Sequence, residues 1–128
     1  MAKVYIFLAD GFEEIEALTV VDLLRRAGIE INMVSITGKQ EVTGSHKISV
    51  LADVLFEDTD FDDADMIVLP GGMPGTLNLM EHEGLDKLLN NFHRVNKNIA
   101  AICAAPSVLA SKGILTGKKA TCYPGIES

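Results

Sequence analysis

Short runs of apolar residues along the chain predict buried β-strands. The runs cover residues 4–9, 29–36, 66–69 and 99–102. The first is nearly continuous, contains β-branched and aromatic residues and ends at Asp10-Gly11, which is typical of a strand buried on both faces of a sheet. Residues 39–54 are less regular, and we expect a turn at Gly44-Ser45 between two short extended pieces.

Stretches with helical spacing lie between these runs. Over residues 13–27 the apolar positions Ala17, Val20, Val21, Leu24 and Ala27 recur at that spacing, and Gly28 is expected to end the helix. A second amphipathic helix is predicted from the positions Leu85, Leu88, Leu89, Phe92 and Val95. A third is expected to begin at Pro106 and to end at Gly113. Strands alternating with helices predict an α/β fold, in which helices cover both faces of a mainly parallel sheet.

Composition limits the classes of function. A chain of 128 residues with 48% hydrophobic residues is predicted to form one domain, residues 1–128, with a real core. No apolar run reaches the length of a membrane span, and the start of the chain has no secretory cleavage pattern, so we expect no membrane partner and a cytoplasmic location. The net charge of −7, without a basic cluster, argues against nucleic acid. Two cysteines in such a compartment argue against a disulfide framework.

Ligands of open α/β sheets bind beyond the carboxyl ends of the strands, where three segments carry candidate chemistry. One of them is Cys103, placed where a strand leads abruptly into a helix. Ala101 and Ala105 supply the small residues that such a sharp turn needs around a nucleophile. The helix start would favour thiolate over thiol. The alternative is that Cys103 is a small buried hydrophobic residue.

The second segment is Gly71-Gly72, which follows a predicted strand. Glycines there let backbone N–H groups approach a ligand closely, as an oxyanion-binding site requires. Taken alone, the pair is better explained as an ordinary turn, because the stretch does not match the dinucleotide or phosphate-loop glycine patterns.

The third segment runs from Asp10 to Glu16. Glu16 shares a helical stripe with Val20, Leu23 and Ala27, so the acid is expected to be desolvated and to favour its protonated form. A protonated Glu16 could donate a hydrogen bond to the sulfur of Cys103. Acids near a helix start also complement the helix dipole, and Glu13 precedes an apolar stripe as well, so periodicity does not choose between them. These acids would repel the phosphate of a flavin.

Three motifs, in their order and separation, resemble those of the ThiJ/PfpI family. They are ADGFEEIEA at residues 9–17, LPGG at residues 69–72 and AAICAAP at residues 100–106. The resemblance implies a flavodoxin-like three-layer sandwich of the class I glutamine amidotransferase type. It also implies that Cys103 is the reactive cysteine, that Glu16 hydrogen-bonds it, and that the amides of Gly72 and Ala104, beside Gly71, act as oxyanion-type donors.

The same resemblance implies a cysteine-dependent enzyme that acts on a small reactive carbonyl such as methylglyoxal, with no metal and no organic cofactor. It further implies a homodimer in which the first helix lies at the interface. The alternative is an oxidative-stress sensor or chaperone, in which peroxide oxidises Cys103 to sulfinic acid. Peptidase or amidase activity is disfavoured, because these reactions call for a histidine beside the cysteine.

The chain departs from the family pattern in two places. Tyr123 stands where many members have a histidine near the cysteine, and the sequence ends at Ser128, before the family's further strands and closing helix. His46, His82 and His93 are too scattered in the predicted elements to replace that partner, and we expect His82 and His93 at the surface. Cys122 is expected in the core, and the alternative is that it resolves an oxidised Cys103.

Overall fold

The computed structural model describes residues 3–94 and 98–101. Its elements, in chain order, are β1 (Lys3–Leu8), α1 (Glu14–Arg26), β2 (Glu30–Ser35), β3 (Glu41–Thr43), β4 (Ser49–Leu51), β5 (Val54–Leu55), the 3-10 turn η1 (Phe56–Asp58), β6 (Met66–Leu69), α2 (Gly75–Glu81), α3 (Glu83–Arg94) and β7 (Asn98–Ala101).

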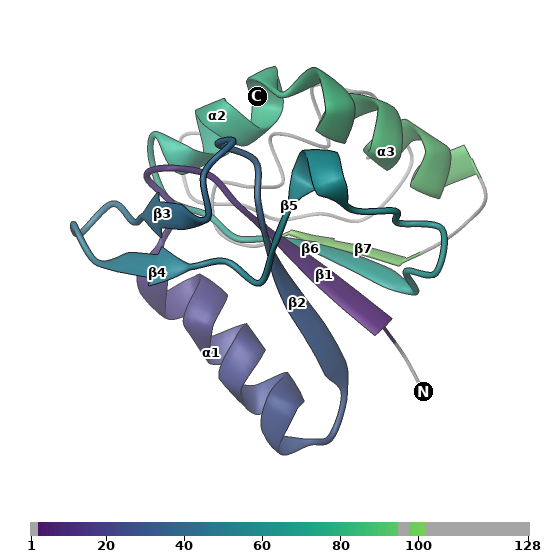
Figure 1. Cartoon of the computed structure of the whole chain (residues 1–128), viewed down its shortest axis with the longest axis horizontal. Helices are drawn as coiled ribbons and strands as arrows, with labels where there is room; N and C mark the ends of the chain where they lie inside the picture. Colours follow the sequence, from purple (N-terminus) through teal and green to yellow (C-terminus); the bar gives the residue numbers. More distant parts are fainter. Residues whose placement is uncertain (1–2, 95–97, 102–128) are drawn as a thin grey trace.

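Five strands form one parallel sheet in the order β5-β2-β1-β6-β7, and β3 pairs with β4 in a separate antiparallel hairpin. Helix α1 lies on one side of the sheet and α2 with α3 on the other (Figure 1). The chain adds strands on one side of β1 and then on the other, which makes the carboxyl ends of β1 and β6 a topological switch point. The predicted flavodoxin-like α/β fold is confirmed.

Each face of the sheet has its own core, because side chains alternate along every strand. Tyr5, Phe7 and Ala9 pack with the apolar residues of α2 and α3. Ile6 and Leu8 face the other way and pack with Ala17 and Val21 of α1 and with the β3–β4 hairpin. Within the described residues, no helix is both long enough and apolar enough to cross a lipid bilayer.

The strand predictions are confirmed over the described residues, and the run 66–69 has the bounds of β6. The predicted first helix is α1, with Glu13 as its N-cap and Ala27 as its C-cap, and Gly28 follows with a φ of 79°. The hairpin confirms the turn expected at Gly44-Ser45. Helix α2 was not predicted from the sequence. The helix predicted from Pro106 to Gly113 lies outside the described residues.

Candidate functional site

The first turn of α1 holds the glycine turn that follows β6. The backbone N–H of Glu13 donates to the carbonyl of Gly71 at 2.8 Å, and the N–H of Gly71 donates to Oε1 of Glu16 at 2.9 Å. Gly71 is therefore bound through both of its backbone polar groups. Glu16 and Gly71 are in direct contact at the switch point, although each was predicted as a site residue from a different motif of the sequence.

Gly72 is required at its position for two reasons. Its φ is 102°, a left-handed conformation that side chains disfavour. A Cβ atom there would also overlap the amide nitrogen of Glu13 and lie 2.7 Å from the carbonyl oxygen of Gly11. The N–H of Gly72 donates no hydrogen bond to any described residue. The structure thus presents a constrained turn whose second amide has no acceptor among the described residues.

Two neighbouring glycines complete this packing of backbone against backbone. The N–H of Gly75 donates to the carbonyl of Gly11 at 3.1 Å. A Cβ on Gly11, whose φ is 90°, would lie 2.5 Å from Cδ of Pro74, and a Cβ on Gly75 would lie 2.7 Å from the oxygen of Gly11. The chain segments that leave β1 and β6 are therefore locked together where ligands of this fold class bind.

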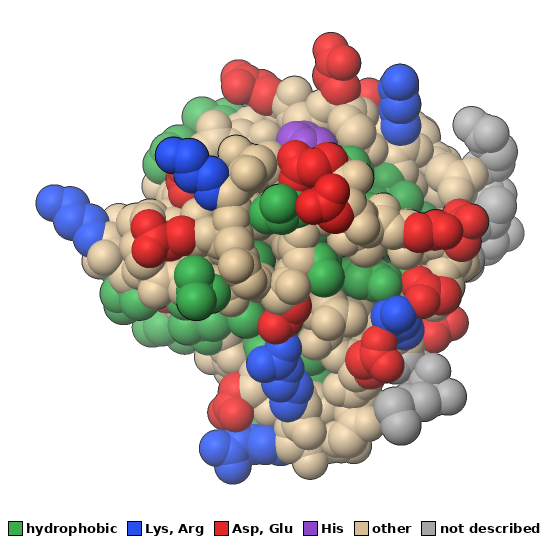
Figure 2. All heavy atoms as spheres, viewed as in Figure 1, with side chains coloured by type: hydrophobic (Ala, Val, Ile, Leu, Met, Phe, Trp, Pro, Cys, Tyr) green, Lys and Arg blue, Asp and Glu red, His purple; other side chains and the backbone are tan. Residues whose placement is uncertain are grey.

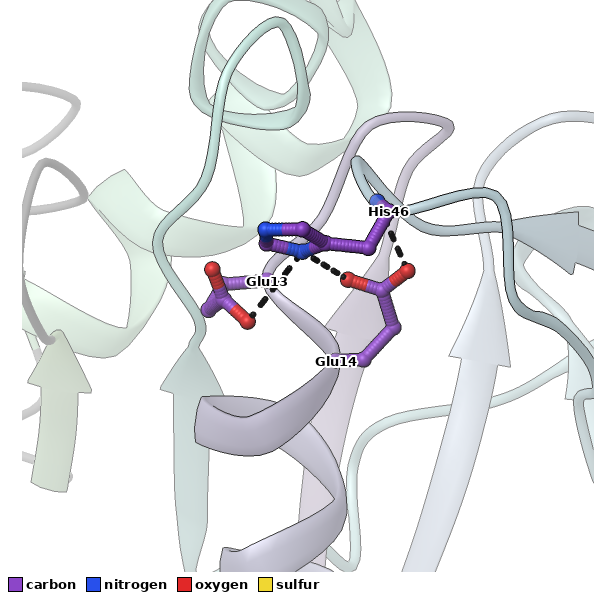
Figure 3. A group of neighbouring side chains, drawn as sticks. All are labelled: Glu13, Glu14 and His46. Atoms are coloured by element: carbon purple, nitrogen blue, oxygen red, sulfur yellow. Dashed lines mark hydrogen bonds and ion pairs between the residues drawn. The ribbon is translucent and has the colours of Figure 1, made fainter.

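A buried carboxylate fixes the β3–β4 hairpin against the start of α1. Glu14 is only 3% exposed, and its Oε2 accepts hydrogen bonds from the backbone N–H groups of His46 at 2.8 Å and Ile48 at 3.2 Å. Its Oε1 lies 2.9 Å from Nδ1 of His46 (Figure 3). The side chain of Glu14 also fills the space that a Cβ on Gly44 would need. The hairpin position therefore depends on Glu14.

These contacts shift the pKa values of both partners. Burial is the largest single effect on Glu14 and opposes its ionisation, but the hydrogen bonds from His46 and from backbone N–H groups together outweigh burial and lower its pKa to about 2. The pKa of His46 is raised, first by its hydrogen bond to Glu14 and then by the charges of Glu13 and Glu14. The pair is therefore an ion pair in mildly acidic solution.

Glu13, Glu14 and His46 each place one possible ligand atom within 4.8 Å of the others. The described residues thus include a potential metal-ligand set, although no metal was expected from the sequence. Both oxygens of Glu14 already accept hydrogen bonds, however, and Glu13 caps α1 by accepting from the N–H of Ile15 at 3.2 Å. These existing bonds explain the cluster as the anchor of the hairpin and of the helix start.

A cavity of about 350 Å³ lies beyond the carboxyl ends of β1 and β2, on the side of α2. It is lined by Ala9, Asp10, Ile36, Thr37, Asn78, Glu81 and His82. The part of this lining that the structure describes holds two carboxylates and no Lys or Arg, a combination that does not suit a phosphate group. The observation agrees with the sequence argument against a flavin phosphate at this edge.

The burial expected for the stripe that contains Glu16 is wrong for its second half. Glu16 is half-buried, but Leu23 is 59% exposed and Ala27 is exposed too. The core of α1 is formed instead by Ala17 and Val21, with Glu14 buried beside them. Val20 of that stripe packs against the core, whereas the later members Leu23 and Ala27 face solvent in the single chain.

The histidine predictions need one correction. The ring of His82 is half-buried rather than at the surface: it contacts Phe56 edge to face at 4.7 Å, and its Nδ1 accepts a hydrogen bond from the N–H of Leu85 at 2.9 Å. Burial lowers the pKa of His82, opposed by the charge of Glu57. The predictions for Cys103, Ala104, Cys122 and Tyr123, and for the His93 side chain, concern parts of the chain outside the described residues.

Comparisons with known proteins identify relatives of this chain. A model described as the DJ-1/PfpI family matches residues 2–128. The chain is 37% identical over 125 residues to protein DJ-1 homolog B of Arabidopsis thaliana, covering 97% of this chain and 28% of that protein. It is 38% identical over 122 residues to protein dj-1beta of Drosophila melanogaster, covering 95% and 65%. The chain therefore spans less than two thirds of these two relatives.

A protein named deglycase from Pyrococcus abyssi is 34% identical over 126 residues, which cover 98% of this chain and 74% of that protein. Among solved structures, oxidized Toxoplasma gondii DJ-1 matches with a TM-score of 0.93 and 39% identity, covering 97% of this chain and 68% of that one.

Proposed function

We propose that this chain, which belongs to the DJ-1/PfpI family as its motifs predicted, has an enzymatic function. The proposed enzyme is cysteine-dependent, needs no cofactor and is of the glyoxalase or deglycase type. The substrate class is a small reactive carbonyl such as methylglyoxal. The observation that carries the proposal is the Gly71 peptide, which Glu13 and Glu16 hold at the switch point. A relative named deglycase supports the same reaction class.

Chain connectivity supports a position of the proposed nucleophile near this turn. Leu69 of β6 pairs with Ala101 of β7, and Cys103 is two residues further along the chain. Two residues span at most about 7 Å, and Gly71 likewise follows Leu69 by two residues. We therefore expect the thiol beside the peptide that contacts Glu16.

The proposed reaction needs no external oxidant or reductant. The Cys103 thiolate attacks the aldehyde carbon of methylglyoxal and forms a C–S bond, while the carbonyl oxygen becomes an alkoxide and takes a proton. The amides of Gly72 and Ala104 stabilise that oxyanion until it is protonated. Glu16 moves the proton from the former aldehyde carbon to the neighbouring carbonyl carbon, and the hydroxyl proton passes from the first oxygen to the second, so that the first carbon becomes the C=O of a thioester. Water then cleaves the resulting thioester, which releases lactic acid and restores the thiol.

The test is the rate of methylglyoxal consumption by the wild type and by Glu16→Gln. We expect kcat to fall by about 100-fold in Glu16→Gln, because the amide cannot exchange a proton during the reaction. Glu83→Gln, which alters an exposed glutamate at the start of α3, is the matched control and should retain wild-type kcat. Equal kcat in the wild type and Glu16→Gln would exclude the proposed proton transfer.

A sensor role is the second candidate, and the solved T. gondii relative, described as oxidized, favours it. In that role peroxide adds oxygen to the sulfur of Cys103, and the Gly72 amide and Glu16 hold the resulting sulfinic group. The same residues would serve both roles, but only the enzyme converts many substrate molecules for each protein molecule.

We also propose that the protein is a homodimer whose interface includes α1 and the β3–β4 hairpin. Large apolar side chains are exposed on these elements: Ile15, Leu23, Ile48 and Leu51. Figure 2 shows hydrophobic side chains gathered beside the hairpin. Exposed apolar groups on two neighbouring elements are typical of an interface.

Leu51→Asp is expected to convert the dimer to a monomer, because it places a charge on a side chain that is 64% exposed in the single chain. Light scattering after size-exclusion chromatography measures the mass. The control is Leu77→Asp on α2, since Leu77 is also exposed, at 49%, but lies outside the proposed interface. If the Leu51→Asp protein still has the mass of a dimer, the interface lies elsewhere.

A further inference from the structure

The cavity beyond the carboxyl ends of β1 and β2 has no part in the proposed reaction. Its volume of about 350 Å³ lies in the range of small-molecule sites. Its lining comes from three parts of the chain, which are the segment after β1, the segment after β2 and the last turns of α2. The proposed nucleophile instead follows β7, which lies two strands away from β1 in the sheet. The cavity is therefore a candidate for a separate binding site.

The wall of this cavity combines apolar groups with a fixed polar group. Ala9 is 1% exposed and belongs to the core, and Ile36 is half-buried and packs against the same core. Asn78 joins α2 to the end of β1, because its Nδ2 donates to the carbonyl of Asp10 at 2.8 Å. Its Oδ1 accepts no hydrogen bond from the described residues. An apolar wall with a few oriented polar groups is typical of a small-molecule site.

Two carboxylates line the cavity without a cation to balance them. Asp10 is held in place because its Oδ1 accepts the N–H of Thr43 at 3.1 Å, while its Oδ2 has no partner among the described residues. The side chain of Glu81, the last residue of α2, makes no hydrogen bond or ion pair with a described residue. Both carboxylates therefore have oxygens that can accept hydrogen bonds from a ligand.

His82 does not supply the missing positive charge. Its Nδ1 accepts the N–H of Leu85 at 2.9 Å, so the neutral ring carries its proton on Nε2. Burial lowers the pKa of His82 from its ordinary value of 6.5, and the ring is therefore uncharged near neutral pH. A neutral imidazole between carboxylates leaves the cavity negatively charged.

The placement of these groups favours an organic cation over a metal ion. A metal site needs several ligand atoms around one point. Within the described ranges, one set of three acidic or histidine side chains has that arrangement, and it belongs to the start of α1 and the β3–β4 hairpin rather than to this cavity. An ammonium group brings a positive charge and three N–H donors, and an alkyl chain packs well against an apolar wall.

We propose that the cavity binds a short aliphatic diamine, whose two ammonium groups pair with Asp10 and Glu81. The alkyl chain between them packs against Ala9 and Ile36, and the Oδ1 of Asn78 accepts a further N–H. Hydrogen bonds between charged groups are stronger than those between neutral groups, which gives the diamine an advantage over an uncharged molecule of the same shape. The site needs no residue outside the described part of the chain and is independent of the proposed reaction.

The test is calorimetric titration of the full chain with putrescine near neutral pH. A salt concentration of about 0.15 M screens general attraction to a protein of net charge −7. We expect saturable binding, and an affinity about tenfold lower in Glu81→Gln, because one charged hydrogen-bond partner is lost. Asp10→Asn keeps an oxygen for the Thr43 N–H and should lose a similar amount. The matched control is Glu83→Gln, an exposed glutamate outside the lining, which should retain the wild-type affinity.

Two further probes separate charge from shape. Butylamine has one ammonium group and should bind about tenfold more weakly than putrescine, whereas uncharged butanediol should give no measurable heat of binding. Absence of putrescine binding by the folded wild type would overturn the inference. Equal affinities in the wild type, Glu81→Gln and Asp10→Asn would also overturn it, since they would show only a general attraction to an acidic protein. The titration contains no carbonyl substrate, so its failure and the failure of the proposed enzyme are distinguishable.

Discussion

Gly72→Ala is expected to destabilise the fold by about 3 kcal/mol or more, because a left-handed conformation and a steric overlap act together. The φ of Gly72 is 102°, and an added Cβ would overlap the Glu13 amide nitrogen, which donates to Gly71. Neither the turn nor the start of α1 can move without breaking that hydrogen bond. Urea unfolding, followed by circular dichroism, measures the loss.

Gly38→Ala is the matched control for backbone conformation. Gly38 has a similar φ of 84°, but nothing lies within 4 Å of the position that its Cβ would occupy. Gly38→Ala should therefore lower the free energy of unfolding only by the penalty for a left-handed backbone, about 1 kcal/mol. Equal losses in the two variants would show that close packing at Gly72 contributes nothing, contrary to the arrangement of the turn described above.

Glu14→Gln is the second substitution with a large expected effect, a loss of about 2 to 3 kcal/mol at pH 6. Glutamine can still accept through one oxygen, but its amide group would meet either the backbone N–H groups or the imidazole of His46, all of which approach carboxylate oxygens in the wild type. Urea unfolding measures the difference. Glu41→Gln, an exposed glutamate on β3, should lose little.

The loss should depend on pH in a defined direction. The pKa of Glu14 falls from 4.5 to about 2 on folding. Its contribution to the free energy of unfolding is therefore complete above pH 4.5 and disappears as the pH falls toward 2. The pKa of His46 rises from 6.5, so its contribution is complete below pH 6.5 and disappears as the pH rises through the folded-state value. The difference between wild type and Glu14→Gln should therefore be largest between pH 4.5 and 6.5. A constant difference from pH 2 to 8 would contradict the ion pair.

Most of the fold could be predicted from the sequence because burial on both faces leaves a clear apolar pattern. Residues 66–69 and the first helix illustrate this, since an uninterrupted run and a 3.6-residue period are local signals. Helix α2 gave no such signal: it has seven residues and follows a segment of glycine and proline. Its position depends on contacts between Gly75 and Gly11, which are distant in the sequence.

The candidate site was predicted only in part for a similar reason. Glu16 and Gly71 were each identified from local features, and the structure joins them. Glu14 was interpreted only as one of the acids that complement the helix dipole and would repel a phosphate, because its partners come from the hairpin more than 30 residues later. Thr76, whose buried hydroxyl has no hydrogen-bond partner among the described residues, carried no sequence signal, since such a hydroxyl is recognised only once its surroundings are known.

The measurement that tests the central claim most directly is methylglyoxal consumption and lactate formation by the wild type and by Cys103→Ser, with intact mass recorded before and after peroxide. We expect the wild type to convert many equivalents without an added cofactor, and Cys103→Ser to convert none. Equal turnover in both proteins, or no turnover in the wild type, would contradict the proposed enzyme. In the second case, a gain of two oxygen atoms on Cys103 alone would identify the protein as a thiol sensor.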